Sequence, residues 1–382
     1  MSGADGSMLE VPPPLPGAAG ALPVARATSE GPSAIRAPSR RVTIADIARQ
    51  CGVSPATVSR VLNNKPQFSV SPPVRARILE TARGAGYFPD LAARNLTRGS
   101  TNIVGVFTAP PTPLGTGVNE PILEGVADVL HGGGYDVFLE LGAVRRPQAA
   151  LPFWRFDGAI LLQDPRADAV AELDQRRVPY VCVNERAGTP AALVLADDRM
   201  GMRLAVEHLA TLGHRRLAYA NAGADYSPHY SVRERHETLV RHTRAAGIAL
   251  APGHDVPPGE PAEFLRATVL SAGATAVIAY DHSIAAALVL AAHGLGLRVP
   301  ADFSLICFND LFPVALLTPP LTAVAVCGRE MGRVGAELLL NVLQATGARA
   351  TRRESRVAEE LIVRSSTAPP PSVDPLAASR HA

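Results

Sequence analysis

The 382-residue chain lacks the features that mark membrane, exported and metal-binding proteins. No apolar run reaches the ~18 residues that a membrane-spanning helix needs. Only four cysteines are present, and none is spaced as a metal site or a CxxC pair, which predicts reduced thiols and no bound metal. No export signal is evident, because Asp5 and Glu10 stand where a secretory signal carries positive charge. These absences predict a cytoplasmic protein that does not contact a membrane.

Motifs of common α/β enzymes are also missing. No GxGxxG follows a predicted strand, and neither a P-loop nor a nucleophile elbow is found. Adjacent acids such as Asp197 and Asp198 point apart, so they make a poor catalytic dyad. We therefore predict a binding protein without enzymatic activity and without a cofactor. An enzyme on the same scaffold is the alternative, and it would require a nucleophile or an acid–base pair that no motif reveals.

Charge is distributed unevenly along the chain. The net charge is only +2, but residues 40–100 hold ten basic and three acidic residues, so the rest of the chain is acidic overall. A solvated charged face does not explain this segregation. A basic module on an acidic body indicates that the module has a polyanionic partner, and nucleic acid is the expected one.

Two short helices are predicted in RVTIADIARQCGVSPATVSRVLNNKP, which begins at Arg41. Thr43 and the acid three residues later resemble a capping box that starts the first helix, and Gly52 ends it. Ser54 caps the second helix, whose first position is Pro55. This helix-turn-helix pattern presents the start of the second helix to the DNA major groove. An ordinary helical hairpin is the alternative, and the basic charge argues against it.

Arg60 is the long hydrogen-bond donor on the presented face, and arginine paired with guanine is the commonest specific base contact. A third helix is predicted from Pro72 to Ala85, capped by Ser71 and stopped by Gly86. Its apolar stripe is Val74, Ile78, Leu79 and Ala82. The side chains predicted at the groove are Pro55, Ala56, Thr57, Ser59 and Arg60, with Ser54 at the cap.

From Asn102 onward, short apolar strands alternate with amphipathic helices. This alternation predicts doubly wound parallel sheets in two lobes, which enclose a cleft at the carboxyl ends of the strands. The predicted strands are IVGVFT, YDVFLEL, GAILL, PYVCVN, LVLA, LAYAN, AVIAY and SLICF, and the predicted helices include residues 122–131, 200–212, 233–246 and 283–293.

VTIADIARQCGVSPATVSRVLNN, GYFPDLAARNL and IVGVF follow one another in this order, and they resemble the head, the hinge and the first sensor strand of the LacI/GalR family of bacterial repressors. RLAVEHLATLGHRRLAY, GLRVPADFSLICFND and LLTPPLTAV extend the resemblance over roughly residues 41–367. It implies a homodimeric repressor that binds a pseudo-palindromic operator in double-stranded DNA under the control of a small effector, a sugar or a sugar acid.

The resemblance also assigns DNA contacts. Residues 89–97 match a hinge helix that enters the minor groove, where Leu96 would wedge between base pairs, in keeping with other apolar wedges that bend DNA. Packing of Leu96 on the head is the alternative. Phosphate contacts are implied for Thr43, Ser59, Asn63 and Tyr87, and hinge-lining positions for Ala93 and Arg94.

Five effector-binding positions are implied as well: Asn184, Arg233, Tyr280, Asp281 and Asn309. Arg233, in SVRERHETL, matches an arginine that holds sugar hydroxyls or a carboxylate. Asn184 and Asn309 replace frequent aspartates, and Tyr280 replaces an asparagine, so each of them could instead only pack the cleft. One arginine among neutral amides favours an anionic effector, because a guanidinium fork suits a carboxylate.

Together these observations predict an α/β protein: an all-α helix-turn-helix head plus a two-lobed periplasmic-binding-protein-like sensor with doubly wound parallel sheets. A sugar-binding transport protein would share the sensor fold, but it would need an export signal and would lack the basic head. A dimer is favoured because the C-terminal tail has no leucine heptads. The predicted boundaries are a disordered tail at 1–40, the head at 41–88, the hinge at 89–100, the sensor at 101–367 and a second disordered tail at 368–382.

Overall fold

The computed structural model places the chain in two units, Met1–Asp90 and Leu91–Ala382. The first unit contains the head and the second contains both lobes of the sensor. Within the described ranges, none of the helices combines the length and the apolar character that a membrane crossing requires. The structure describes residues 42–63, 69–87, 100–108, 117–141, 156–162, 165, 167–222, 229–251, 255–256, 260–345 and 353–371.

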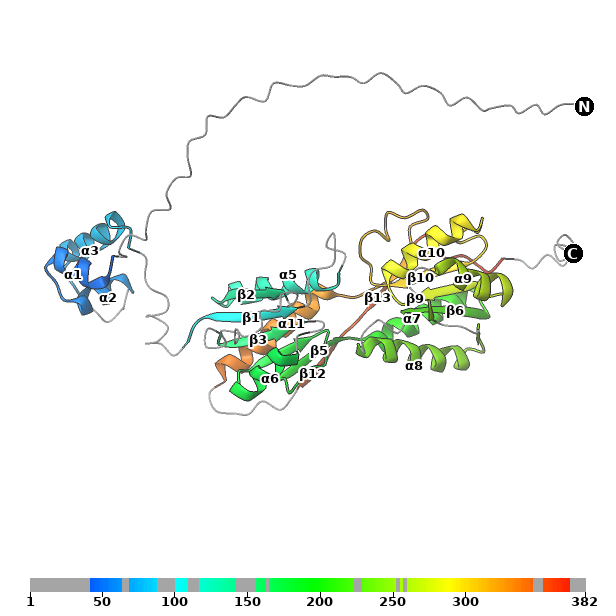
Figure 1. The fold of residues 1–382 in the computed structure, drawn as a ribbon, viewed down its shortest axis with the longest axis horizontal. Coiled ribbons are helices and arrows are strands. Elements are labelled where there is room, and N and C mark those ends of the chain that lie inside the picture. Colours follow the sequence, from blue (N-terminus) through cyan, green and yellow to red (C-terminus); the bar gives the residue numbers. More distant parts are fainter. Residues whose placement is uncertain are drawn as a thin grey trace, which may run out of the picture. The chain divides into compact units, whose positions relative to one another are not determined.

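The described part of the head contains three helices (Figure 1), and the first two begin at the predicted caps. The Asp46 carboxylate accepts hydrogen bonds from the Thr43 hydroxyl (2.7 Å) and the Thr43 N–H (3.0 Å), which confirms the capping box. Gly52 ends the first helix in the left-handed conformation, with φ 61°. Ser54 Oγ accepts from the Thr57 N–H (3.1 Å) and caps the second. The helices are α1 (Ile44–Cys51), α2 (Pro55–Leu62) and α3 (Pro72–Gly84).

A small apolar core joins the three helices, and Ile47, Val58 and Ile78 are fully buried in it. The prediction that Leu79 faces this core is wrong, because its side chain is 38% exposed. Successive helical residues point about 100° apart, so Ile78 takes the inward position and its neighbour turns outward. Ser71 stands at the N-cap of α3 as predicted, but its side chain makes no capping hydrogen bond.

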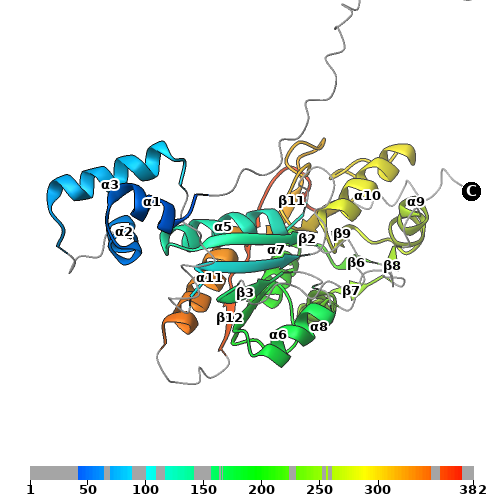
Figure 2. The same ribbon diagram turned by 60° about the vertical axis from the view of Figure 1, so that its left-hand side comes forward.

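Lobe 1 is a parallel sheet covered on both faces (Figures 1 and 2). Along β1, Val104 and Val106 pack under α5 and α11, whereas Phe107 packs on the other face with α6. This alternation is the period-2 pattern of a strand buried on two sides. The strand order is β12-β5-β4-β3-β1-β2. The elements are β1 (Ile103–Thr108), α5 (Asn119–Gly132), β2 (Asp136–Leu141), β3 (Gly158–Leu161), α6 (Ala167–Arg176), β4 (Tyr180–Val183), β5 (Ala192–Ala196), α11 (Gly328–Gln344) and β12 (Arg353–Val357).

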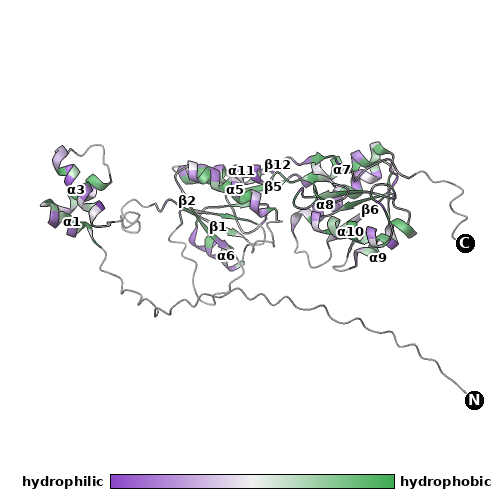
Figure 3. Cartoon of the chain, turned by 90° about the horizontal axis from the view of Figure 1, so that it is seen from above, coloured by the Kyte–Doolittle hydropathy of each residue, from purple (hydrophilic) through white to green (hydrophobic). Residues whose placement is uncertain are grey.

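Lobe 2 repeats this design, with the strand order β13-β11-β10-β9-β6-β7 and β8 paired to β6. Its sheet is parallel except at β13, which runs antiparallel to β11. The strands colour as hydrophobic in both lobes (Figure 3), because helices cover both faces of each sheet. The elements are α7 (Asp198–Leu212), β6 (Arg216–Ala222), α8 (Tyr230–Ala245), β7 (Ala249–Leu250), β8 (Asp255–Val256), α9 (Pro261–Leu265), the π-helical segment η3 (Arg266–Ser271), β9 (Ala276–Ala279), α10 (His282–Gly294), β10 (Ser304–Phe308), β11 (Thr322–Ala325) and β13 (Glu360–Ile362).

All eight predicted strands and the four predicted sensor helices are present, and their ends shift by at most three residues. The order in which the chain passes between the two lobes was not predicted. The chain passes between the lobes after β5, after β11 and after β12, so that α11 and β12 return to lobe 1. Asp198, Cys327 and Glu359 lie at or beside these three crossings.

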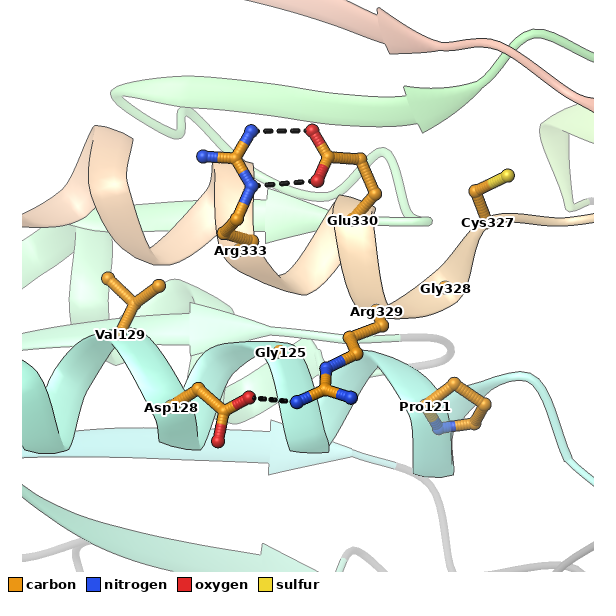
Figure 4. A pocket seen from close by; sticks show the side chains of 9 residues that line it. All are labelled: Pro121, Gly125, Asp128, Val129, Cys327, Gly328, Arg329, Glu330 and Arg333. Atoms are coloured by element: carbon orange, nitrogen blue, oxygen red, sulfur yellow. Dashed lines mark hydrogen bonds and ion pairs between the residues drawn. The ribbon is translucent and has the colours of Figure 1, made fainter.

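A groove on the surface of lobe 1 separates parts of α5 and α11 (Figure 4). The two helices can approach closely because Gly125 and Gly332 have no side chain. A Cβ atom at either position would clash with the backbone of the opposite helix. Arg329 of α11 forms an ion pair with Asp128 of α5 across the groove (2.6 Å). This groove is built from helix surfaces and contains none of the predicted effector residues.

His214 fastens the C-terminal segment to lobe 2. Its Nε2 donates to the Ala368 carbonyl (2.9 Å), and its Nδ1 is hydrogen-bonded to the Thr275 hydroxyl (2.8 Å). The packed chain therefore extends at least to Ala368, beyond the predicted sensor end at Thr367. Burial, together with the nearby His208, lowers the pKa of His214 below its ordinary value of 6.5.

We expect this histidine to make the sensor less stable in acid. The folded state binds its proton less readily than the unfolded state, so stability is complete above about pH 6.5 and falls as the pH decreases below that value. Between pH 6.5 and 5.5 this group can remove at most about 1.4 kcal/mol. Chemical unfolding of the whole chain at both pH values, with His214→Gln as the non-titrating comparison, measures it. An identical pH dependence in both proteins would contradict the assignment.

Candidate functional site

One side of α2 and its N-cap is exposed on the surface of the head. Ser54, Pro55, Ala56 and Arg60 are exposed, and Thr57 and Ser59 are half-buried. The opposite face of the helix carries Val58 and Val61, which are buried in the core. The structure therefore brings together on one surface all the side chains predicted to read bases.

The residues predicted to contact phosphates differ in their exposure and in their contacts within the head. Thr43 is exposed at the start of α1, and Asn63 at the end of α2 donates from its side chain to the Ser59 carbonyl (2.8 Å). Tyr87 is half-buried and packs against the head core. Their phosphate contacts stay predictions. The predicted hinge residues Ala93, Arg94 and Leu96 lie outside the described residues, so the wedge stays a prediction as well.

In the sensor, four of the five predicted effector residues follow the carboxyl ends of strands. Asn184 follows β4 of lobe 1 and Asn309 follows β10 of lobe 2, which occupy equivalent places in the two sheets. Both asparagines have a positive φ, 56° and 66°, a conformation that asparagine tolerates and that recurs at functional sites. Tyr280 and Asp281 follow β9. Ligands of doubly wound sheets bind at these ends.

Contacts from the start of α8 connect these residues. The Tyr230 hydroxyl donates to Asn184 Oδ1 (3.0 Å), and the Ser231 and Tyr280 hydroxyls are hydrogen-bonded (2.8 Å). Asn309 Oδ1 is buried without a hydrogen-bond partner among the described residues. Asp281 has a clear structural task, because its carboxylate accepts from the Ile284 N–H (2.8 Å) and caps α10.

Arg233, the fifth predicted effector residue, does not lie at a strand end with the other four. Its side chain is 75% exposed on α8 and pairs only loosely with Glu237, one turn later, at 3.9 Å. The arginine that the structure places beside Tyr280 is Arg235, which is 4% exposed. The expectation that Arg233 lies with the other predicted effector residues is therefore wrong, and Arg235 lies beside Tyr280 instead. Contact of either arginine with an effector stays a prediction.

Arg235 is buried and has partners within the protein itself. Its Nε donates to Asp198 Oδ1 (2.5 Å) and its Nη1 to the Tyr280 carbonyl (2.6 Å). Its guanidinium lies 4.0 Å from the centre of the Phe308 ring and 4.9 Å from that of Tyr280, distances at which a cation is attracted to an aromatic face. Glu359 approaches from the third interlobe crossing at 3.9 Å. An effector would therefore meet an arginine that already has carboxylate partners.

Burial and the neighbouring Asp198 raise the pKa of Glu359 well above its ordinary value. Asp198 accepts a hydrogen bond from Arg235 Nε and pairs with its positive charge. The positive field that favoured an anionic effector is absent from this cluster.

The sequence did contain a signal for Arg235. Leu239 of α8 is fully buried, and a residue four positions earlier lies on the same helical face. That residue is Arg235, whereas Arg233 lies on the opposite side. The partners Asp198 and Glu359 had no comparable signal, since they come from other elements.

Comparison with known proteins agrees with both units. Residues 43–90 match the bacterial regulatory proteins of the lacI family, and residues 206–367 match the periplasmic binding protein-like domain. An uncharacterized HTH-type transcriptional regulator in the aml 5′ region of Streptomyces limosus is 32% identical over 360 residues, which cover 85% of this chain and 94% of that protein. The regulator MalR of Streptomyces coelicolor is 30% identical, over 86% of this chain and 97% of its own length.

Solved structures show the same fold. The lac repressor dimer bound to operator and the anti-inducer ONPF superimposes with a TM-score of 0.70 at 22% identity, over 86% of this chain and all of that chain. The transcriptional regulator CelR in complex with cellobiose has a TM-score of 0.59 at 26% identity, over 85% of this chain and all of its own. With a helix-turn-helix head, a two-lobed sensor and relatives of this similarity over most of its length, the chain belongs to the LacI/GalR family of DNA-binding transcriptional regulators.

Proposed function

We propose that this regulator is a homodimeric repressor that binds a pseudo-palindromic operator and responds to a neutral sugar. The observation that carries the DNA-binding part is the surface of α2, where Arg60 is exposed beside small side chains on the face opposite the core. Two heads of a dimer would read half-sites one helical turn, about 34–36 Å, apart. The protein acts by binding rather than by catalysis, and it acts in the cytoplasm, where the operator is.

Substitution of Arg60 tests whether this side chain recognises a base in the operator. We expect Arg60→Ala to weaken operator binding by about 1–3 kcal/mol and to relax the preference at one base pair in each half-site. The matched control is Arg83→Ala, which removes the same charge from an exposed position of α3. Selection from random DNA, followed by binding measurements on the selected site, gives both quantities. An unchanged base preference in Arg60→Ala would contradict the proposed role.

The effector part of the proposal uses Asn184, Tyr280, Asp281 and Asn309 from the predicted set, with Arg235 in the place first assigned to Arg233. The Asn309 side-chain oxygen, which has no hydrogen-bond partner among the described residues, is an acceptor for a hydroxyl. Because Asp198 already neutralises Arg235, the proposed effector is uncharged. The cellobiose complex of the similar regulator CelR is in keeping with this class.

Calorimetry with pairs of a neutral sugar and its aldonic acid tests whether the effector is uncharged. We expect a neutral sugar to bind more tightly than its aldonic acid, since a carboxylate would find no free cation in the Arg235 cluster and would face Asp198. The measurement uses the whole chain and pairs such as cellobiose with cellobionic acid. Tighter binding of the acid would contradict the neutral class and would leave the repressor assignment standing.

A further inference from the structure

The first turn of α8 belongs to lobe 2 by chain order but is anchored in lobe 1. Further along the helix, Leu239 packs in the lobe 2 core. Tyr230, at its start, is 6% exposed, and its ring lies in the apolar cluster of lobe 1 with Leu193 and Leu195. Its hydroxyl accepts from the N–H of Ala196 in β5 (3.0 Å) and donates to Asn184 Oδ1 (3.0 Å). One aromatic side chain therefore crosses between the two cores.

One turn later, Glu234 makes a second anchor. It is 4% exposed, and its carboxylate accepts two hydrogen bonds from Arg356 of the lobe 1 strand β12, at 2.7 and 2.9 Å. Arg199 at 3.6 Å and Arg186 at 3.9 Å complete the cage. Burial alone would raise the pKa of Glu234, but these arginines, above all Arg356, lower it. A bidentate ion pair whose carboxylate is buried is costly to break, because separation removes the two hydrogen bonds that compensate the desolvation of Glu234.

The same turn contacts the candidate effector residues. His229 Nε2 donates to the Asn184 carbonyl (2.8 Å), and the His229 Nδ1 is within 2.7 Å of the Ser231 hydroxyl. Ser231 in turn is hydrogen-bonded to the Tyr280 hydroxyl (2.8 Å). The turn therefore joins the strand end of lobe 1 at Asn184 to the strand end of lobe 2 at Tyr280.

We propose that residues 229–234 form an interlobe latch, which holds the two lobes in one relative arrangement through Tyr230 and Glu234. The latch differs from the three chain crossings because its anchors are side-chain contacts and not the main chain itself, although Ala196 and Arg356 lie beside two of those crossings. An effector bound at Tyr280 would adjoin the latch, so its strength would set how readily the sensor changes state. This signalling role rests on the proposed function, whereas the latch itself does not.

A distance measurement between the lobes tests the latch. Spin labels are placed by Arg176→Cys on α6 and Arg266→Cys at the start of η3, whose side chains are 49% and 54% exposed. The background carries Cys327→Ser, because the other three cysteines are buried. An excess of unlabelled subunits keeps one labelled copy per dimer. Electron–electron double resonance then reports the interlobe distance without effector or DNA, so this result is independent of the proposed function.

We expect one narrow distance distribution for the unaltered latch. Glu234→Gln and Arg356→Gln should each add a population at other distances, and the double variant should add no more than either alone, since both break one ion pair. Glu237→Gln, on the exposed face of the same helix, is the matched control and should leave the distribution unchanged. Tyr230→Phe keeps the buried ring and removes only the hydroxyl bonds, so it tests the latch even if the charge variants fold poorly. Distributions that superimpose for Glu234→Gln, Arg356→Gln and Tyr230→Phe would overturn the proposal.

Discussion

Arg235→Ala is expected to lower the free energy of unfolding of the sensor by about 3–5 kcal/mol, the typical cost of removing one partner of a buried ion pair. The substitution strands the Asp198 carboxylate, which is fully buried with one oxygen already unpartnered among the described residues. It also removes the cation that lies between Phe308 and Tyr280. Chemical unfolding of the whole chain, followed by circular dichroism, measures the loss.

Arg233→Ala is the matched control, two residues away on the same helix. Its side chain is 75% exposed, and substitutions at such surface sites usually change stability by less than about 0.5 kcal/mol. Equal losses in the two variants would show that Arg235 is not the buried partner of Asp198. A larger loss for Arg233→Ala would show that Arg233, and not Arg235, is the buried arginine of α8.

Operator affinity should fall about 10³–10⁵-fold between 50 and 200 mM salt if a dimer neutralises about 6–10 phosphates, because each contact releases condensed counterions. The expectation follows from the ten basic residues between positions 40 and 100, against three acidic ones. Fluorescence anisotropy with the selected operator gives the slope of log affinity against log salt. Removal of one phosphate-contacting charge should reduce that slope by about one. A nearly flat salt dependence would contradict the DNA-binding assignment of the head.

The head was the most predictable part of the molecule. Thr43, Gly52 and Ser54 each act on backbone groups within five residues of themselves, so their roles are encoded in short stretches of sequence. Leu79 shows the limit of this reasoning: two adjacent apolar residues both fit an amphipathic stripe, and only packing decided that Ile78 faces the core.

The candidate effector site was predictable in part. Asn184, Tyr280, Asp281 and Asn309 follow predicted strands, and the rule that ligands bind at strand ends places them together. The choice between Arg233 and Arg235 depends on the exact phase of α8, and the stretch SVRERHETL contains few apolar residues to define it. Glu234, placed in an arginine cage 122 positions from Arg356 in sequence, had no local signal at all.

By itself the sequence determined the helix-turn-helix head, the alternation of strands and helices, and the family, because caps, periodicities and motifs act between residues that are near neighbours in the chain. Only the tertiary structure decided which charges are buried and which lobe each element joins. Arg235 is paired with an aspartate 37 residues away, and α11 and β12 return to lobe 1 before β13 adds the last strand to lobe 2. Burial of a charge is stable only where a partner from another element meets it, so such pairs become visible only when the chain is folded.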